Sequence, residues 1–553
     1  MRSSTPAAPR EHLTAGAQLA PPAAGRQTRA LRRRGRLSPG RTLPRCMRWT
    51  LLLLALAVLL PQAAGCRQPV DGHAPKQAKP PHIIFILIDA LRADRVGCFG
   101  GERNLTPTID QIAAEGVCFE RTIAAAPWTQ PSVASLFCSC YPEVHKVQSY
   151  GQAWDSTFTD TPKVAVFSDA FTTLAEMLQQ QGYQTAAFSA NPFVIAEYGY
   201  GQGFEHFDSS FASFTKESTT GAVVNDAVGA WLAQRDTARP TFLYLHYMDV
   251  HGPYEGDPEF LDARLAALEA EPNKHELTEE EDRRLAHLRR LPTSVSDPAR
   301  HERLMPYREY WEARYEAGVR QMDNYLAALR QRLEELGVWQ NAYVIVAADH
   351  GEALCEHHYW DHGLGVHDNQ LHVPLILRWP GVLPAGRRVG ATVRLIDVLP
   401  TIADQFRLAP LAGVQGISLL PHLQSGPAPA PVAAFAESVK QGTEQKALYS
   451  GRLKVMYLEA TPPRLDLFDI VADPHEQRSI AQQTDPRQLR ALLTMVQRQM
   501  QENATLAATI ESAAVPIDEA QRRRLESLGY FGSTPTPATQ PASEAESDSP
   551  PAP

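Results

Sequence analysis

The chain has few cysteines, and none are arranged as a zinc-binding or disulfide-exchanging pair. Seven occur in 553 residues, and no two are spaced as Cys-x-x-Cys. This absence excludes a zinc ribbon and a thioredoxin-type redox site. An excess of positive charge is also missing, because 53 Lys and Arg residues stand against 62 Asp and Glu residues, giving a net charge of -9. A broad nucleic-acid-binding face needs clustered basic residues and is therefore not expected.

A membrane-spanning apolar run is lacking at the N-terminal end as well. The apolar run of residues 51–60 is too short to span a bilayer, but it is typical of the core of a secretory signal. The surrounding stretch 47–66 ends in "AAGC", which resembles a bacterial lipobox with Cys66 as the lipidated residue. Ordinary signal cleavage, with Cys66 incidental, is the alternative. We expect export to the bacterial periplasm or cell surface, with a lipid anchor in the membrane.

The flanking segments show no pattern of a folded core. Residues 1–46 are rich in Arg, Ala and Pro, and we treat them as an N-terminal extension outside the fold. Residues 67–80 form a polar linker, and residues 533–553 contain almost no bulky apolar side chain, which predicts a disordered tail.

Between these ends, strand-length apolar runs alternate with helical patterns, which predicts an α/β fold with a sheet covered on both faces. Three of the runs end in potential ligands: "HIIFILID" in Asp89, "TFLYLHYMDVHGPY" in Asp249 and His251, and "AYVIVAADHGE" in Asp349 and His350. Functional groups collect at the carboxyl ends of strands in such sheets. Carboxylates and imidazoles that meet at one edge of the sheet would make a metal site.

These segments resemble the sulfatase family of the alkaline phosphatase superfamily. The resemblance rests on "HIIFILIDALRADRVGCFG", "APWTQPSVASL", "HYMDVHGPY", "ADHGEALCEHHYWDH" and "HVPLILRWPG", in that order, and extends from about residue 81 to 529. It implies an alkaline-phosphatase-like large mixed β-sheet flanked by helices in residues 81–425. A smaller C-terminal subdomain with an antiparallel sheet is expected in residues 432–530.

The resemblance places Thr129 at the nucleophile position. Family sulfatases carry Cys or Ser there, in a C/S-x-P-x-R motif whose first residue becomes formylglycine. Here "TQPSV" puts Thr129 first and Val133 where Arg is expected, so no formylglycine is expected. The string "CYPEV" at Cys140 mimics the motif but lies eleven residues too late. The alternative for Thr129 is a plain helix cap without chemistry.

By the same resemblance, one divalent metal ion is expected. Its ligands would be Asp89, Thr129, Asp349 and His350. Relatives that bind calcium have a second Asp where this chain has Ala90. The loss of a carboxylate and the gain of an imidazole favour Zn²⁺ or Mn²⁺, with Ca²⁺ possible.

Four further residues are candidates for substrate contact. His251 resembles the family's His that can protonate the leaving oxygen, and His362 occupies the place of an anion-binding Lys. Arg92 either reaches the ester oxygens or pairs with Asp94. Asn191 lies near the family's substrate loop, although an Asn-Pro turn explains it equally well.

Taken together, the sequence predicts an exported, metal-dependent hydrolase that cleaves a sulfate, phosphate or phosphonate ester of a sugar, lipid or small molecule. Thr129 would attack, and water would release the adduct. One alternative is a transferase that passes a phospho-alcohol group, such as phosphoethanolamine, to an acceptor. Another is a non-catalytic lipid-anchored binding protein that keeps the fold.

Overall fold

The computed structural model describes residues 80–148, 163–212, 220–254, 256–270, 305–409, 411–424, 429–438, 444–516 and 518. The predicted N-terminal extension, signal segment and lipidation site at Cys66 lie outside these residues, as do nearly all of the linker and the whole C-terminal tail. Among the described helices, none combines the length and apolar character needed to cross a membrane.

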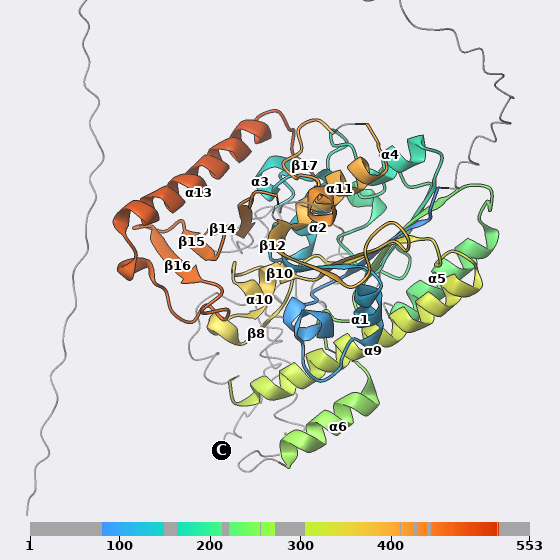
Figure 1. Cartoon of the computed structure of the whole chain (residues 1–553), viewed down its shortest axis with the longest axis horizontal. Helices are drawn as coiled ribbons and strands as arrows, with labels where there is room; N and C mark the ends of the chain where they lie inside the picture. The colour runs from blue at the N-terminus through green and yellow to red at the C-terminus, as the bar shows by residue number, and fades with distance from the viewer. Residues whose placement is uncertain are drawn as a thin grey trace, which may run out of the picture. The chain divides into compact units, whose positions relative to one another are not determined.

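The centre of the fold is a mixed nine-stranded sheet (Figure 1). Its strands run in the order β10-β2-β11-β7-β1-β6-β4-β5, with β12 paired to β2. Their bounds are β1 Ile83–Ile88, β2 Val117–Ile123, β4 Gln184–Ser189, β5 His206–Asp208, β6 Thr241–Tyr247, β7 Tyr343–Ala348, β10 His372–Val373, β11 Leu375–Arg378 and β12 Arg387–Arg394. Strands β7, β1, β6, β4 and β5 are parallel, whereas β11 pairs antiparallel with both β7 and β2.

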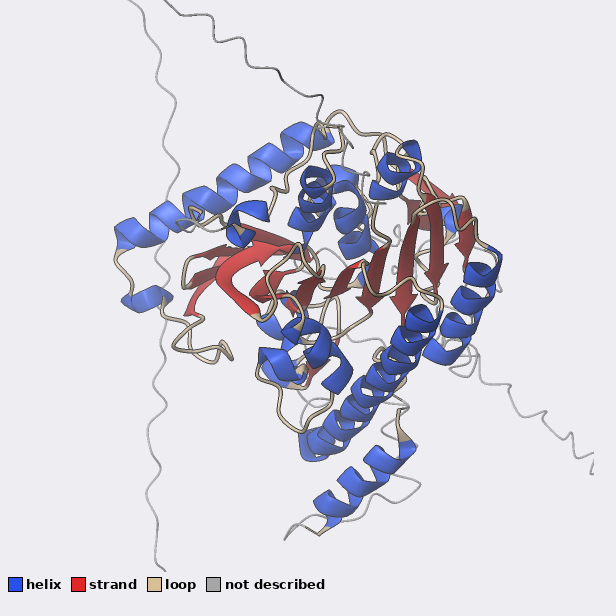
Figure 2. Ribbon diagram, turned by 45° about the vertical axis from the view of Figure 1, so that its right-hand side comes forward, coloured by secondary structure: helices blue, strands red, loops and turns tan. Residues whose placement is uncertain are grey.

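Helices cover both faces of this sheet (Figure 2). One face packs against α2 Thr129–Cys138, α4 Leu174–Gln180 and α11 Val398–Gln405, and the other against α1 Pro107–Ala114, α5 Gly221–Gln234 and α9 Arg308–Glu335. Alternate residues of β1 enter the two cores, with Phe85 in the first and Ile86 in the second. Burial on both faces explains why β1 reads as a continuous apolar run instead of an alternating one.

A second, smaller sheet follows toward the C-terminus. Strands β13 Ala434–Ser438, β14 Gln445–Ser450, β15 Leu453–Leu458 and β16 Arg464–Asp469 form an antiparallel meander. Leu492 and Val496 of helix α13 Pro486–Ala507 pack in one core with residues of this meander. The predicted large mixed sheet and small antiparallel sheet are both confirmed.

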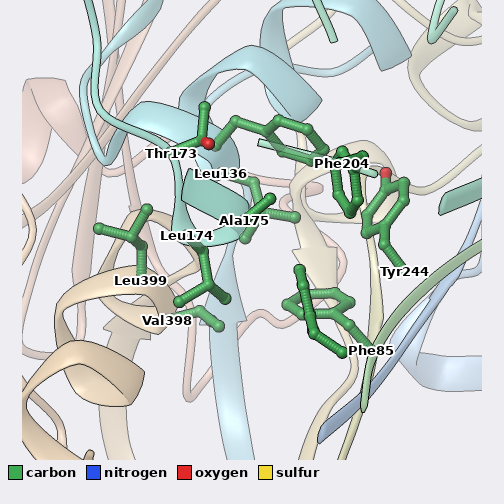
Figure 3. A pocket seen from close by; sticks show the side chains of 11 residues that line it. Phe85, Leu136, Thr173, Leu174, Ala175, Phe204, Tyr244, Val398 and Leu399 are labelled. Atoms are coloured by element: carbon green, nitrogen blue, oxygen red, sulfur yellow. The ribbon is translucent and has the colours of Figure 1, made fainter. Parts of the chain in front are cut away.

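The core between the large sheet and helices α2, α4 and α11 contains a small void of about 30 Å³ (Figure 3). Leu136 of α2, Leu174 of α4 and Val398 of α11 line it together with Phe85 and Tyr244 of the sheet. The lining is apolar, so the void is a packing defect and not a binding site.

Candidate active site

The predicted metal ligands lie at one edge of the sheet, where three neighbouring parallel strands end. Ile88 of β1 is in register with Tyr247 of β6 and with Ala348 of β7. Asp89 follows β1, and Asp349 and His350 follow β7, so the chain delivers them to one edge. The third strand brings His246, the next-to-last residue of β6.

Thr129 reaches the same point from helix α2. The helix begins at Thr129, with Trp128 as its N-cap residue in an extended conformation, and all of its residues are buried. The Thr129 hydroxyl donates to Asp89 Oδ2 at 3.3 Å and lies 3.2 Å from His350 Nε2. The N-terminal end of a helix carries partial positive charge, which favours an anionic ester at this position.

Each of the two carboxylates uses one oxygen to fix its position and leaves the other without a hydrogen bond. Asp89 Oδ2 accepts from Asn191 Nδ2 at 2.6 Å, and Asp349 Oδ1 accepts from the backbone N–H groups of His350 and Ala90. Asp89 Oδ1 and Asp349 Oδ2 are buried and have no donor in the described part of the chain. Two buried carboxylate oxygens without hydrogen-bond donors are energetically costly unless a cation binds beside them.

The two histidines complete this group. His350 Nδ1 lies 2.7 Å from the carbonyl of Gly351 and so carries a proton that it donates there, which leaves the lone pair of Nε2 for the site. Nε2 lies 3.4 Å from Asp89 Oδ1 and 3.6 Å from Asp349 Oδ2. His246 Nε2, also buried and without a hydrogen bond, lies 3.4 Å from Asp89 Oδ2. In a metal-binding histidine, the ring nitrogen that does not face the ion usually donates its proton to a carbonyl or carboxylate, as Nδ1 of His350 does here.

The titration of these groups follows from their crowding. Burial raises the pKa of Asp89, but the adjacent imidazoles of His246 and His350 outweigh it and hold that pKa well below its usual value. Burial and the neighbouring charge of Asp89 raise the pKa of Asp349. Burial lowers the pKa of His350, but the charge of Asp349 outweighs it and raises that pKa. The carboxylates therefore hold a positive charge between them, as a proton or as a metal ion.

These residues fit a divalent metal ion. One atom each of Asp89, His246 and Asp349 lie within 4.8 Å of one another, and all three side chains are buried. With His350 and Thr129 the donors are two carboxylates, two imidazoles and a hydroxyl. A mixed nitrogen and oxygen set suits Zn²⁺ or Mn²⁺ better than Ca²⁺, which prefers oxygen alone.

His251 and His362 lie beside this group. The ring of His362 is 4.5 Å from the ring of His350 and 4.8 Å from that of His251, centroid to centroid. Burial lowers the pKa of His251 to about 4. Burial also lowers the pKa of His362, but Asp361 and Glu352, whose oxygens lie 2.9 and 3.2 Å from Nδ1, outweigh it and raise that pKa to about 10. The pair therefore combines a neutral imidazole with a protonated one.

The remaining predicted residues have structural contacts. Arg92 pairs with Asp94 and Glu356 and donates to the carbonyl of Glu352, in line with the structural alternative for this residue. The Asn191 amide donates to Asp89 and also lies 3.4 Å from Thr129 Oγ1, so it faces the site. A role of either residue in substrate binding stays a prediction. Cys140 follows the end of α2, and its thiol contacts the carbonyl of Gly413.

Two residues of the site were not predicted from the sequence. His246 lies inside β6, and Glu352 lies in the loop after Asp349 and His350, and neither was a candidate from the sequence. A polar residue within a wholly buried strand, three positions before Asp249, was the available signal for His246. Glu352 had no comparable signal, because its position beside His362 depends on how the loop folds back.

Comparison with known proteins places most of this chain in one family model. The sulfatase model matches residues 81–408, and a model described as N-sulphoglucosamine sulphohydrolase, C-terminal, matches residues 355–504. An N-acetylglucosamine-6-O-sulfatase of Bacteroides thetaiotaomicron is 25% identical over 533 residues, which cover 82% of this chain and 91% of the relative. A Delta 4,5-hexuronate-2-O-sulfatase of the same organism is 24% identical over 485 residues, covering 83% and 96%.

Solved structures agree with the fold. A protein in complex with its substrate D-glucosamine-2-N,6-O-disulfate matches with a TM-score of 0.60 at 20% identity, covering 77% of this chain and 99% of that one. The phosphonate monoester hydrolase of Agrobacterium radiobacter matches with a TM-score of 0.58 at 20% identity, covering 77% and 96%. Both share the alkaline-phosphatase-like arrangement of a large mixed sheet flanked by helices.

Proposed function

Because this chain belongs to the sulfatase family, whose members are hydrolases that act on ester bonds, we propose that it cleaves a sulfate or phosphate ester through Thr129. The observation that carries the proposal is the position of the Thr129 hydroxyl at the start of α2. It lies within 3.3 Å of both Asp89 and His350, in the group of residues that fits a metal ion.

Each residue of the site has a separate role in an in-line displacement. Asp89 accepts the hydrogen bond of the Thr129 hydroxyl and orients it, and Asn191 holds Asp89 in turn. As the bond from Thr129 Oγ1 to sulfur or phosphorus forms, the hydroxyl proton passes to the Asp89 carboxylate that it contacts, and the bond to the leaving alcohol oxygen breaks. Asp89, His246, Asp349 and His350 would hold a divalent ion, whose positive charge would favour the alkoxide and offset the charge of the ester.

The leaving oxygen needs a proton, and the adduct needs water. His362 carries a proton that Asp361 and Glu352 stabilise, and His251 lies next to it, so we assign the acid to this pair. Water then attacks the sulfur or phosphorus of the Thr129 adduct, releases sulfate or phosphate and restores the hydroxyl. This route releases a phosphate adduct of Thr by attack of water at phosphorus, with the metal and the acid pair supplying the catalysis. A sulfate adduct lacks the hemiacetal route that formylglycine provides.

The substrate class is part of the same proposal. Two relatives are named for their action on sulfated sugars, and one matching structure contains a glucosamine disulfate. We therefore propose an ester of a sugar as the first class to test. Export and lipid attachment at Cys66 stay predictions from the N-terminal sequence.

A pair of variants tests the nucleophile. Thr129→Ala should lower turnover by roughly 10³-fold or more, because the covalent route is lost while the metal and anion sites remain. Cys140→Ala, a buried cysteine beyond the end of α2, is the matched control and should keep nearly full turnover. Both are measured with panels of sugar sulfates and sugar phosphates, followed by intact-mass analysis for an adduct. Full turnover of Thr129→Ala, or a formylglycine at Cys140, would show the assignment to be wrong.

A further inference from the structure

A second group of potential metal ligands lies apart from the first and shares no residue with it. One atom each of His357, His367 and Glu476 lie within 4.8 Å of one another. His357 lies in the 3-10 turn Glu356–His358, His367 is the N-cap residue of helix α10 Asp368–Leu371, and Glu476 comes from the loop after β16. The group therefore joins two segments that precede the small sheet in the sequence to a loop that follows it. His357 is part of the segment "ADHGEALCEHHYWDH", but the proposed reaction assigns no role to any of the three residues.

One of the two imidazoles presents a buried and unpaired ring nitrogen to this group. The His367 side chain is about nine-tenths buried, and its Nδ1 has no hydrogen-bond partner in the described part of the chain. Its ring stacks on that of His357, with centroids 3.8 Å apart and planes 8° apart. An unpaired and buried ring nitrogen is costly unless a ligand takes it.

The carboxylate of Glu476 is already positioned for such an ion. Its Oε2 accepts from the backbone N–H of Asp368 at 2.8 Å, and Lys454 pairs with Oε1. Asp368 in turn pairs with Lys454 at 2.9 Å and with Arg121 at 2.6 Å. The four formal charges around the group therefore cancel. Carboxylates that bind metal are commonly held by neighbouring donors in this way.

The ligand atoms of this group determine which kind of ion it fits. Ca²⁺ and Mg²⁺ need several unpaired oxygen ligands, which the group does not offer. Two imidazoles and one carboxylate suit Zn²⁺ or a related transition metal, with a fourth position left open. His357 and Glu476 also line a cleft of about 650 Å³ that contains His475, so the open position faces a space that admits solvent.

The backbone supports the same conclusion. His357 has φ of 53° and Glu476 has φ of 53°, so both occupy the left-handed region that side-chain-bearing residues rarely adopt. Such conformations are costly and recur at functional sites. Here they direct two side chains from distant parts of the chain toward the same point.

We propose that His357, His367 and Glu476 form a second transition-metal site, which binds Zn²⁺ and links the two sheets. For both imidazoles to bind one ion, the stacked rings tilt away from each other and each turns one nitrogen toward the ion. The site is independent of the proposed reaction, because none of its residues touches Thr129 or the first group of ligands.

Metal content of matched variants tests this proposal. The full chain is stripped with a chelator, incubated with Zn²⁺, passed through a desalting column and analysed for bound zinc. His367→Phe keeps an aromatic ring for stacking and should lose one equivalent relative to the wild type. His357→Phe should lose the same equivalent. His475→Ala removes an exposed histidine of the same cleft and should bind as much zinc as the wild type.

Asp349→Asn separates this site from the first one. This variant should lose the zinc equivalent of the first site, which His367→Phe retains. It should keep the zinc equivalent of the second site, which His367→Phe loses. Circular dichroism and thermal unfolding in chelator check that each variant is folded. If His367→Phe is not folded, the zinc content of His357→Phe decides the test. If folded His357→Phe binds as much zinc as the wild type, the second site does not exist. If Asp349→Asn binds as much zinc as the wild type while His357→Phe loses one equivalent, the second site is supported. The same result would contradict zinc binding at the first site, which the proposed reaction uses.

Discussion

His246 offers the sharpest test at the scale of single residues. It is fully buried, and its Nε2 lies 3.4 Å from Asp89 Oδ2 and 4.0 Å from Asp349 Oδ2. His246→Gln should weaken Zn²⁺ binding at the first site by at least about 10- to 100-fold, because even the loss of a group that only supports a metal ligand costs this much. It should also reduce the preference for Zn²⁺ over Ca²⁺, because an imidazole nitrogen is replaced by an amide. Competitive titration of the stripped protein with both ions measures the two effects.

His206→Gln is the matched control for this variant. His206 also belongs to the large sheet, in β5, but its ring packs against Trp231 instead of the site. We expect its metal affinity to equal that of the wild type. Unchanged Zn²⁺ affinity in His246→Gln would identify His246 as a core histidine without a role in metal binding.

The sequence allowed part of the site to be predicted, for a physical reason. Asp89 and Asp349 follow long apolar runs directly, and three neighbouring parallel strands bring their ends together. Thr129 could be placed only through family resemblance, because a Thr at the start of a helix with Pro in its first turn is common without any chemistry. His246 was missed because a strand buried on both faces gives no alternation to show which way a side chain points.

At the scale of elements, helix α4 provides a prediction about stability. Thr173 and Glu176 form a reciprocal capping box at its start, in which each side chain bonds the other residue's backbone N–H. Thr173→Ala should lower the free energy of unfolding by about 1 kcal/mol. The exposed neighbour Thr172 takes no part in the capping box, so Thr172→Ala should change the free energy of unfolding by less than about 0.5 kcal/mol. Urea unfolding of both variants measures the difference, and equal effects would contradict a role for the cap.

Elements with strong local patterns were predicted well, and those defined by distant pairing were not. The apolar run of "HIIFILID" coincides with β1, and the apolar run of "AYVIVAADHGE" falls on β7. The short strand β10 has only two residues and exists because β2 pairs with it, which no local pattern reveals.

At the scale of the whole molecule, buried ion pairs hold the small sheet against the large one. Lys454 of β15 is fully buried and pairs with Asp368 and Glu476. Lys454→Met leaves two buried carboxylates without this partner, and we expect a loss of about 3–5 kcal/mol in the free energy of unfolding.

Arg452 provides the comparison for Lys454. It lies two residues earlier, and its pair with Asp469 is at the surface. Arg452→Met should lower the free energy of unfolding by less than about 1 kcal/mol. Denaturant unfolding in the presence of chelator measures both. Similar losses for the two variants would mean that burial does not decide the strength of these pairs.

The meeting of β1, β6 and β7 at one edge also governs when the protein can become active. Asp89 and His350 lie on either side of about half of the chain, and the Ala90 N–H that steadies Asp349 comes from 259 residues away. Contacts of such long sequence separation form slowly and late in folding. A fragment that ends before β7 lacks Asp349 and His350, so it would lack half of the residues proposed to hold the metal. We therefore expect the proposed activity only from chains in which β7 has paired with β1.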